Sequence, residues 1–188
     1  MSPSTTAPAS ASGTIPRVVS VILNTNRRTD TLECLASLEK SSYPEQQALV
    51  LDNASTDGSV EAIRSAFPDV RVISLASNLG YAGNNNTGIA AALAAGADWV
   101  FVLNEDTVLA ADCLTHLVEA GERDPGIGIV GPLVYHHNEP NLIQSAGGKL
   151  TRYWESFHLA QNAPDEGQFS EPHAVDWISG CGILIRRS

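Results

Sequence analysis

The chain of 188 residues has few basic residues, few cysteines and no long apolar run, and each shortage excludes a class of protein. Only 11 Lys and Arg residues face 21 Asp and Glu residues, and this net charge of −10 argues against binding to nucleic acid or anionic lipid. No apolar run approaches the roughly 18 residues of a membrane span, so we expect at most peripheral membrane association.

The three cysteines, Cys34, Cys113 and Cys181, form no CxxC pair. Their odd number and wide spacing indicate neither a disulfide framework nor a zinc site, which favours a reducing, cytoplasmic location. Of the five histidines, His136 and His137 are adjacent and point in different directions on a strand, so we place them on the solvated surface.

Three nucleotide and nucleophile motifs are also missing. No GxGxxG follows the first predicted strand, and neither GxxxxGK[ST] nor GxSxG occurs. Their absence argues against a dinucleotide oxidoreductase, a P-loop enzyme and a hydrolase with a nucleophile elbow.

The 43% of hydrophobic residues are sufficient for the core of one domain. Residues 1–16, rich in Ser, Thr, Ala and Pro, have the composition of a disordered leader. We therefore expect one folded domain over residues 17–188, or one domain with a small appendage.

Short β-branched runs alternate with amphipathic segments through the first part of the domain. Strands are predicted at 18–23, 48–52, 70–75 and 98–103, followed by a short strand or extended segment within 126–134. Helices are predicted from a capping box at Asp30 and Glu33 to before Pro44, and at 55–67, 81–95 and 112–121, with Gly96 as a C-cap. This alternation predicts an α/β fold with a mainly parallel sheet flanked by helices.

The pattern becomes irregular after residue 134, which divides the domain into halves at 17–134 and 135–188. A Gly-turned hairpin is expected over 142–154, a loop over 161–172, and a final strand pair, or a strand and turn, over 173–187.

Polar residues follow the end of each of the first four predicted strands, at 24–27, 52–57, 78–86 and 104–106. Turn preference explains each cluster separately. Because ligands bind outside the carboxyl ends of parallel strands, four such clusters on one edge indicate a binding site.

Five stretches together resemble the successive motifs of the family 2 glycosyltransferases, particularly the rhamnosyltransferase-like members. They are VSVILNTNRR, LVLDNASTDGS, NLGYAGNNNTGI, DWVFVLNEDTVL and VDWISGCGILIRR, and the resemblance covers residues 18–187. It implies the glycosyltransferase A fold, a nucleotide-sugar donor and a divalent cation, Mg²⁺ or Mn²⁺. It also implies transfer with inversion to a saccharide or lipid-linked acceptor in cell-surface polysaccharide synthesis.

The resemblance assigns roles to residues of this chain. Asn24, Asn26 and Arg27 would line the base and ribose side of the donor pocket, and Asp52 would accept a hydrogen bond from the base. Asp106 would hold the cation and act in catalysis. The chain near the ribose and diphosphate would include Asn78, Gly80, Gly83 and Asn86. The floor under the sugar would be shaped by Trp177, Ser179, Gly180 and Gly182, and the predicted substrate-binding set is completed by Leu23, Asn53, Asn104 and Glu105.

The sequence departs from the family pattern at two places. Asn104 replaces the first acid of the Asp-x-Asp motif, which removes one charge near the cation. The acidic Glu-Asp motif that supplies the general base in the family is not reached before Ser188, so we expect a truncated acceptor-side half. Asp176 is then the candidate base, with a strand-edge turn acid as its alternative role.

These features predict the donor-binding domain of an inverting, metal-dependent glycosyltransferase with dTDP-rhamnose or a UDP-sugar as donor. The alternative is a nucleotide-sugar-binding module or inactive fragment that binds without transfer. A sugar nucleotidyltransferase is disfavoured because the Gly-rich, basic loop after the first strand is missing. Donor base, sugar, acceptor and oligomeric state stay open, and a homodimer is compatible with the sequence.

Overall fold

The computed structural model describes residues 14–187. The predicted leader falls mostly at residues 1–13, which lie outside the described residues. The elements of the sheet half are β1 (Val18–Asn24), α1 (Arg28–Glu39), β2 (Gln46–Asp52), α2 (Ser59–Ala66), β3 (Arg71–Ser74), α3 (Gly80–Ala94), β4 (Trp99–Asn104), α4 (Cys113–Glu122) and β5 (Ile129–Val130). The later elements are β6 (Val134–His136), β7 (Glu139–Ser145), β8 (Gly148–Leu150), β9 (Ser156–His158) and β10 (Gly182–Arg186).

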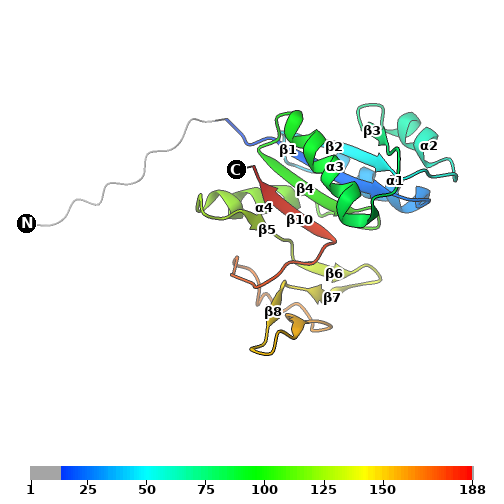
Figure 1. Cartoon of the computed structure of the whole chain (residues 1–188). Coiled ribbons are helices and arrows are strands. Elements are labelled where there is room, and N and C mark those ends of the chain that lie inside the picture. The colour runs from blue at the N-terminus through cyan, green and yellow to red at the C-terminus, as the bar shows by residue number, and fades with distance from the viewer. Residues whose placement is uncertain (1–13, 188) are drawn as a thin grey trace, which may run out of the picture.

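A six-stranded sheet in the order β3-β2-β1-β4-β10-β5 forms the centre of the molecule (Figure 1). The strands β1 to β4 are mutually parallel, and β10 runs antiparallel to β4 and β5. The α/β class and the mainly parallel sheet were therefore predicted correctly. The register places Asn24 beside Asp52 and Leu23 beside Asn104, so polar strand ends lie side by side.

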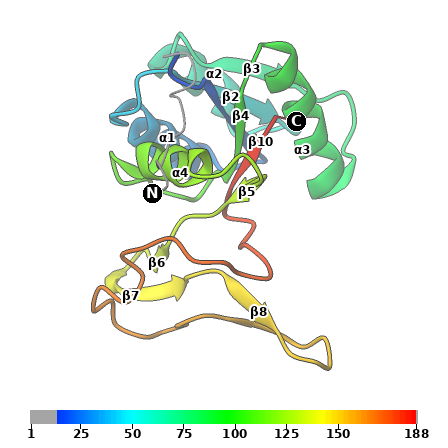
Figure 2. The same ribbon diagram turned by 90° about the vertical axis from the view of Figure 1, so that its left-hand side faces the viewer.

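Helices cover both faces of this sheet, with α3 on one face and α1 and α4 on the other (Figure 2). Alternate residues of β1 divide between two cores: Ile22 packs in the core that contains residues of α1, α2 and α4, and Val21 packs in the core on the α3 side. Gly88 allows α3 to lie close to the sheet, because a Cβ there would be 2.4 Å from Cγ1 of Val21. Burial on both faces explains why the strands are nearly continuous apolar runs.

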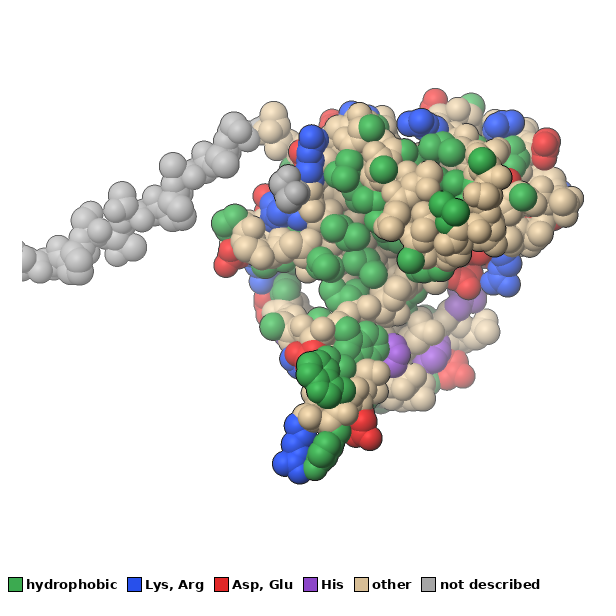
Figure 3. Space-filling model, in the orientation of Figure 1, with side chains coloured by type: hydrophobic (Ala, Val, Ile, Leu, Met, Phe, Trp, Pro, Cys, Tyr) green, Lys and Arg blue, Asp and Glu red, His purple; other side chains and the backbone are tan. Residues whose placement is uncertain are grey.

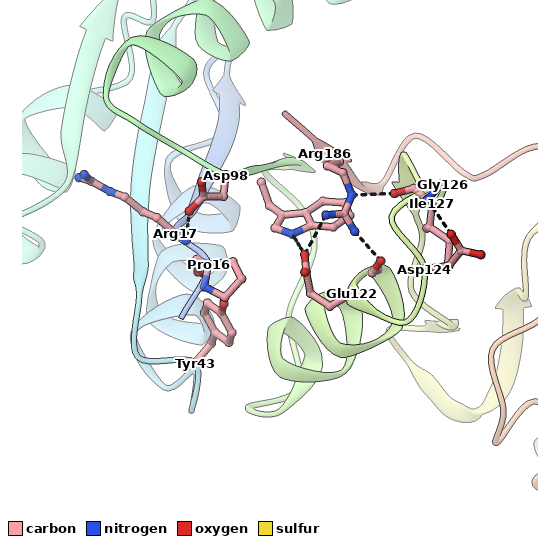
Figure 4. A network of polar contacts seen from close by, with 11 residues as sticks. Pro16, Arg17, Tyr43, Asp98, Glu122, Asp124, Gly126, Ile127 and Arg186 are labelled. Carbon is pink, nitrogen blue, oxygen red and sulfur yellow. Dashed lines mark hydrogen bonds and ion pairs between the residues drawn. The ribbon is translucent and has the colours of Figure 1, made fainter. Parts of the chain in front are cut away.

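Polar contacts at the amino end of the sheet join Arg186 to Glu122 (Figure 4). The Trp99 side chain is fully buried, and its Nε1–H donates to Glu122 at 2.9 Å. The guanidinium of Arg186 lies 4.3 Å from the Trp99 ring centroid and donates to Glu122 at 3.0 Å. Strand β10 is thereby fixed to α4 as well as to β4.

The start of α1 differs from the predicted capping box. The helix begins at Arg28, two residues before Asp30, and it has no side-chain cap from its own N-cap residue. Instead the carboxylate of Asp57, in the loop after β2, accepts a hydrogen bond from the Arg28 amide at 3.0 Å. The predicted end of α3 is confirmed, since Gly96 follows that helix with a φ of +86°.

The second half forms two small hairpins beside the sheet, β6–β7 and β8–β9 (Figure 2). The predicted Gly-turned hairpin over 142–154 was wrong, because its two expected strands belong to different hairpins. Isolated bridges hold the hairpins to loops, including one between Gly148 and Trp177. Of the two alternatives for 173–187, the strand and turn is correct. Within residues 14–187 no helix has the length and hydropathy needed to span a membrane.

Candidate functional site

The strand order reverses between β1 and β4, and the region at the carboxyl ends of these strands, between Asp52 and Asp106, is here called the crevice. The chain passes from β1 outward to β2 and β3 and then returns to the other side of β1 with β4. Ligands of open α/β sheets bind at such a reversal. Contacts join the four polar loops here: Asn24 bonds to Asp52, Arg27 pairs with Asp106, and Tyr81 donates to Asn104. The predicted convergence on one edge is confirmed.

Asn24 is the buried centre of the β1–β2 contact. Its amide nitrogen donates to Asp52 Oδ1 and Ser55 Oγ, both at 2.9 Å, and its oxygen accepts from Thr31 Oγ1 at 2.8 Å. Both side-chain protons and one oxygen lone pair are thus engaged within the protein. Asp52, 3% exposed, also accepts from the Ser55 amide. This geometry assigns Asn24 to positioning Asp52.

The neighbouring predicted residues form the rim of the same contact. Asn26 adopts a positive φ of 54°, and its side-chain oxygen accepts from the Thr56 amide at 2.7 Å. Asn53 donates to Thr25 Oγ1 at 3.3 Å. These bonds tie the loop after β1 to the loop after β2, while Leu23 is half-buried beside Asn104.

Asp106 lies at the other side of the crevice and is accessible. It pairs with Arg27 at 3.4 Å, and both side chains are about half exposed, at 52% and 50%. Arg27 also pairs with Asp30 at 2.7 Å. A small cavity of about 190 Å³ is lined by Asp30, Glu33, Asp106, Val108 and His137. Its carboxylates give the mouth of the crevice a negative charge.

Glu105, next to Asp106, is half-buried. Partial burial raises the pKa of its carboxyl group, and the negative charge of Asp106 raises it further, against the lowering effect of the Arg27 charge. A neighbouring cation would therefore favour the ionised form of Glu105.

The start of α3 contributes backbone amide groups and asparagine side chains. Asn78 accepts hydrogen bonds from the Gly80 amide at 2.9 Å and from Asn84, whose own oxygen accepts from the Leu79 amide. Gly80 has a φ of +74°, which this entry into the helix requires. Gly83 packs against Leu79, where a Cβ would lie 2.6 Å away, and Asn86 is exposed. The predicted loop is thus preorganised at a helix N-terminus, a location that favours anions.

Tyr81 joins this helix to β4 and to the segment before β10. Its hydroxyl lies 3.0 Å from both Asn104 Oδ1 and the Gly180 carbonyl oxygen. Burial raises the pKa of the Tyr81 hydroxyl, as do the acidic groups of Cys181, Glu105 and Asp106, so the phenol stays a donor. Gly180 is thereby joined to the start of α3, and its predicted place under the sugar stays a prediction.

Asp176 and Trp177 lie on the second half of the chain, and their polar contacts join them to β8. Asp176 accepts from the Leu150 amide at 2.8 Å, and Trp177 donates to the Lys149 carbonyl at 3.4 Å. The bond from Leu150, together with the Lys149 charge, lowers the pKa of Asp176. Among residues 14–187, neither Asp176 nor Trp177 makes a hydrogen bond or ion pair with the four loops, in contrast to Gly180.

Sequence reasoning missed Thr31, Ser55, Tyr81, Asn84 and His137. Tyr81 and Asn84 lie in the polar stretch 78–86 that the sequence analysis had already assigned to the site, so their neighbours in sequence were the signal that could have identified them. Thr31 and Ser55 are brought to Asn24 by tertiary structure alone. His137, predicted as solvated surface, is exposed and also lines the small cavity with Asp106.

Between residues 14 and 187, no group of three or more His, Cys, Asp or Glu side chains is arranged to hold a metal ion. Asp106 would therefore hold a cation without a full set of protein ligands, although Asp30 and Glu33 line the same cavity. Such a site needs further oxygen ligands from a substrate, as is usual for Mg²⁺ bound through one or two carboxylates and phosphates.

The fold and site define an open α/β domain with its polar crevice at the reversal of strand order. The model of the family "Glycosyl transferase family 2" matches residues 20–188, so the chain belongs to that family. The predicted membership is therefore confirmed.

Two curated relatives extend this result. An N-acetylglucosaminyl-diphospho-decaprenol L-rhamnosyltransferase of Mycobacterium tuberculosis is 31% identical over 174 residues, which cover 82% of this chain and 56% of the relative. An N-acetylglucosaminyltransferase of Bradyrhizobium elkanii is 33% identical over 127 residues, covering 64% of this chain and 68% of the relative. The chain thus spans little more than half the length of the mycobacterial relative.

Solved structures agree with the fold. A mannosyltransferase from Pyrobaculum calidifontis has a TM-score of 0.59 at 26% identity, covering 66% of this chain and 37% of that chain. TarS of S. aureus, residues 1–349, has the same TM-score at 18% identity, covering 72% and 42%. The predicted glycosyltransferase A fold is confirmed.

Proposed function

We propose that this chain is the donor-binding part of an inverting, cation-dependent glycosyltransferase that moves a sugar from a nucleotide-sugar to a lipid-linked saccharide. The observation that carries the proposal is the crevice between β1 and β4, with buried Asp52 on one side and accessible Asp106 on the other. The name of the mycobacterial relative supports a rhamnosyl donor and a polyprenyl-linked acceptor. Under this proposal the enzyme takes part in cell-surface polysaccharide synthesis.

Asp52 is the proposed acceptor for an N–H group of the base. Each of its oxygens accepts one hydrogen bond within the protein, which leaves lone pairs for a ligand. Asn24 holds the Asp52 carboxylate in place, and Asn26 and Asn53 fix the rim where the ribose would lie. The donor pocket is therefore rigid on the base side before the ligand arrives.

The diphosphate is proposed to lie between Asp106 and the N-terminus of α3. Asn78, Gly80, Gly83 and Asn86 place the start of this helix at the crevice, and helix N-termini favour anions. Asp106 would hold Mg²⁺ or Mn²⁺, and the Pyrobaculum mannosyltransferase was solved in complex with GDP-Man and Mn²⁺. A bound cation supplies charge neutralisation at the leaving diphosphate. Asn104 keeps the Tyr81 hydroxyl in place, and Glu105 adds negative charge beside the cation.

Inversion also requires a general base for the acceptor hydroxyl. The contacts of Asp176 favour a different role, because its carboxylate already accepts the Leu150 amide and its pKa is lowered. A lowered pKa makes a carboxylate a weaker base. We therefore assign Asp176 to bracing β8, with Trp177 packed beside it, and Gly180 to the sugar side of the crevice.

Calorimetric titration with UDP, dTDP and GDP, each with and without Mn²⁺, tests the donor site. We expect one nucleotide to bind in a Mn²⁺-dependent manner, and Asp106→Asn to weaken that binding at least about tenfold, or about 1.4 kcal/mol. The unfolding midpoint should not change, because the Arg27–Asp106 pair is exposed. Asp69→Asn, an exposed acid between α2 and β3, is the matched control. Equal affinity of both variants would refute the assignment of Asp106.

Release of nucleoside diphosphate from the preferred nucleotide-sugar then separates an enzyme from a binder. Transfer predicts faster release when a polyprenyl-diphosphate-linked N-acetylglucosamine is added. Binding without any acceptor-dependent release would favour the non-catalytic module.

A further inference from the structure

The hairpin β8–β9 ends in a cluster of exposed hydrophobic side chains, here called the aromatic tip. Its members are Leu150, Tyr153, Trp154 and Phe157, with exposed fractions of 39%, 68%, 83% and 49%. Trp154 is one of only three tryptophans in the chain, and it is more exposed than any other large hydrophobic residue among those described. Isolated exposed apolar residues are ordinary, whereas four exposed hydrophobic side chains at the end of one short hairpin indicate a contact surface.

The turn that carries the aromatic tip is held in one conformation. Thr151 accepts three hydrogen bonds: its carbonyl accepts from the Trp154 amide at 3.0 Å, and its hydroxyl accepts from the amides of Tyr153 and Glu155, both at 3.2 Å. Trp154 has a φ of 65°, a region that a bulky residue rarely occupies. The fold thus holds a tryptophan in water at a position where Asn or Gly would be less strained.

The base of the hairpin is braced against the segment before β10. Asp176 accepts from the Leu150 amide, Lys149 donates to the Ala174 carbonyl at 3.0 Å, and Gly148 bridges to Trp177. In the space-filling view hydrophobic side chains lie at the lower, protruding end of the molecule, with basic and acidic side chains beside them (Figure 3). The β6–β7 turn, in contrast, brings His137 to the Asp106 cavity. The two hairpins therefore serve different surfaces.

The charges around the aromatic tip nearly balance, since Lys149 and Arg152 are opposed by Glu155 and Asp176. With a net charge of −10, the chain as a whole has no electrostatic attraction to anionic lipid. The guanidinium of Arg152 lies 4.6 Å from the Tyr153 ring centroid. Because a long arginine side chain can extend toward water, this guanidinium can stay among polar headgroups while the Tyr153 ring is buried in lipid. Trp and Tyr are the residues enriched at membrane–water interfaces.

We propose that the aromatic tip inserts into the interfacial region of a lipid bilayer and that aromatic burial, rather than charge, drives this contact. The inference rests on the proposed function, because a lipid-linked acceptor requires the enzyme to work at a membrane surface. A rigid tip also fixes the orientation of the chain on the bilayer, as a flexible loop would not.

Flotation of the whole chain with phosphatidylcholine vesicles tests the proposal. We expect the wild type to bind with little dependence on salt, and Tyr153→Ser/Trp154→Asn to bind at least about tenfold more weakly. Asn tolerates the positive φ at position 154. The control is Ile129→Ser, which removes a 56% exposed hydrophobic residue from the sheet half and should leave vesicle binding unchanged. Tryptophan emission should shift to shorter wavelength with vesicles, mainly from Trp154, because Trp99 is fully buried and Trp177 is half-buried, and the shift should be lost in the double variant.

Nucleotide titration of the same proteins separates this proposal from the proposed function. Tip-dependent vesicle binding without nucleotide binding would refute the function and leave the membrane contact in place. Absence of vesicle binding by the wild type, or equal binding by the double variant, would overturn the membrane contact. So would a dimer, detected by light scattering, that dissociates in the double variant, because the tip would then be a surface between two copies.

Discussion

The two ends of the central sheet use the same kinds of charged residue for different purposes. At the amino end, Arg186 and Glu122 contact each other (Figure 4), and both contact the buried side chain of Trp99. At the carboxyl end, Arg27 and Asp106 are 3.4 Å apart and each is about half exposed. The side chains of Arg186 and Glu122 are 23% and 45% exposed, and both also contact the buried Trp99 side chain, so this group stabilises the fold. Arg27 and Asp106 instead pair at the surface, beside the proposed ligand site. The comparison teaches that what an ion pair contacts, more than its residue types or its exposure, distinguishes a stabilising end from a binding end.

The largest expected effect comes from Trp99→Ala, at the amino end of the sheet. We expect a loss of about 3–5 kcal/mol in the free energy of unfolding, because a fully buried aromatic side chain is replaced by a cavity. Urea unfolding followed by circular dichroism measures it. Trp99→Phe, which keeps a ring but removes the donor to Glu122, should lose less and serves where the alanine variant does not fold. A loss below about 1 kcal/mol in Trp99→Ala would show that this end is not the stabilising one.

Asp52→Ala sharpens the comparison from the carboxyl end. Nucleotide binding should weaken by about 1–3 kcal/mol, the usual cost of losing a hydrogen bond to a charged group. Calorimetry with the preferred nucleotide measures this change at a temperature where the variant is folded. An unchanged affinity would mean that Asp52 serves only Asn24 and Ser55, and the base would then lie elsewhere.

Asn24→Ala is the substitution most able to break the comparison, because Asn24 lies at the carboxyl end and yet is fully buried. We expect the free energy of unfolding to fall by about 1–3 kcal/mol, since Thr31 and Asp52 lose their partner. Asn53→Ala, a half-buried control with one hydrogen bond, should change stability by about 0.5 kcal/mol or less. Equal losses in the two variants would contradict the central role of Asn24.

The sheet half could be predicted from sequence because its elements are specified locally. Apolar runs such as 98–103 are long enough for buried strands, and parallel strands deliver their ends to one edge. Which polar residues at that edge are buried and which are accessible could not be predicted. Asn24 and Asp106 are both polar residues at strand ends, and only tertiary structure shows that the first is enclosed and the second accessible. The predicted capping of α1 was wrong for a similar reason, because the hydrogen bond to the first helical amide comes from Asp57 in another loop.

The second half was harder to predict because its pairing partners are distant. Strands of three residues, such as β8, carry too little alternation to fix a register, and the predicted turn at 146–147 lies between two hairpins. Loop residues complete the hydrogen bonds, as in the bridge between Leu142 and Pro164. Such contacts between loops leave no periodic pattern in the sequence.

The smallest expected effect is the pH dependence that Glu105 gives to the carboxyl end. Burial raises the pKa of Glu105 above its usual value, so the folded state binds the proton more tightly than the unfolded state. This contribution to stability is complete below the usual pKa and is lost as the pH rises through the folded-state pKa. Glu105→Gln, which resembles the protonated acid, should therefore be more stable than the wild type at pH 7 and equal to it near pH 4.

The difference at pH 7 should be about 0.5 kcal/mol or less, because Glu105 is partly exposed and solvent screens its charge. Urea unfolding of both proteins between pH 4 and pH 8 measures it, with Glu61→Gln on the exposed face of α2 as control. Saturating Mn²⁺ and nucleotide should reverse the order of the two proteins, because a cation beside the crevice favours the ionised carboxylate and binding stabilises the folded state. A difference in stability that does not change with pH would contradict the raised pKa of Glu105. The same order of stability with and without ligand would mean that Glu105 faces no cation, and the two ends of the sheet would then not differ in the way proposed.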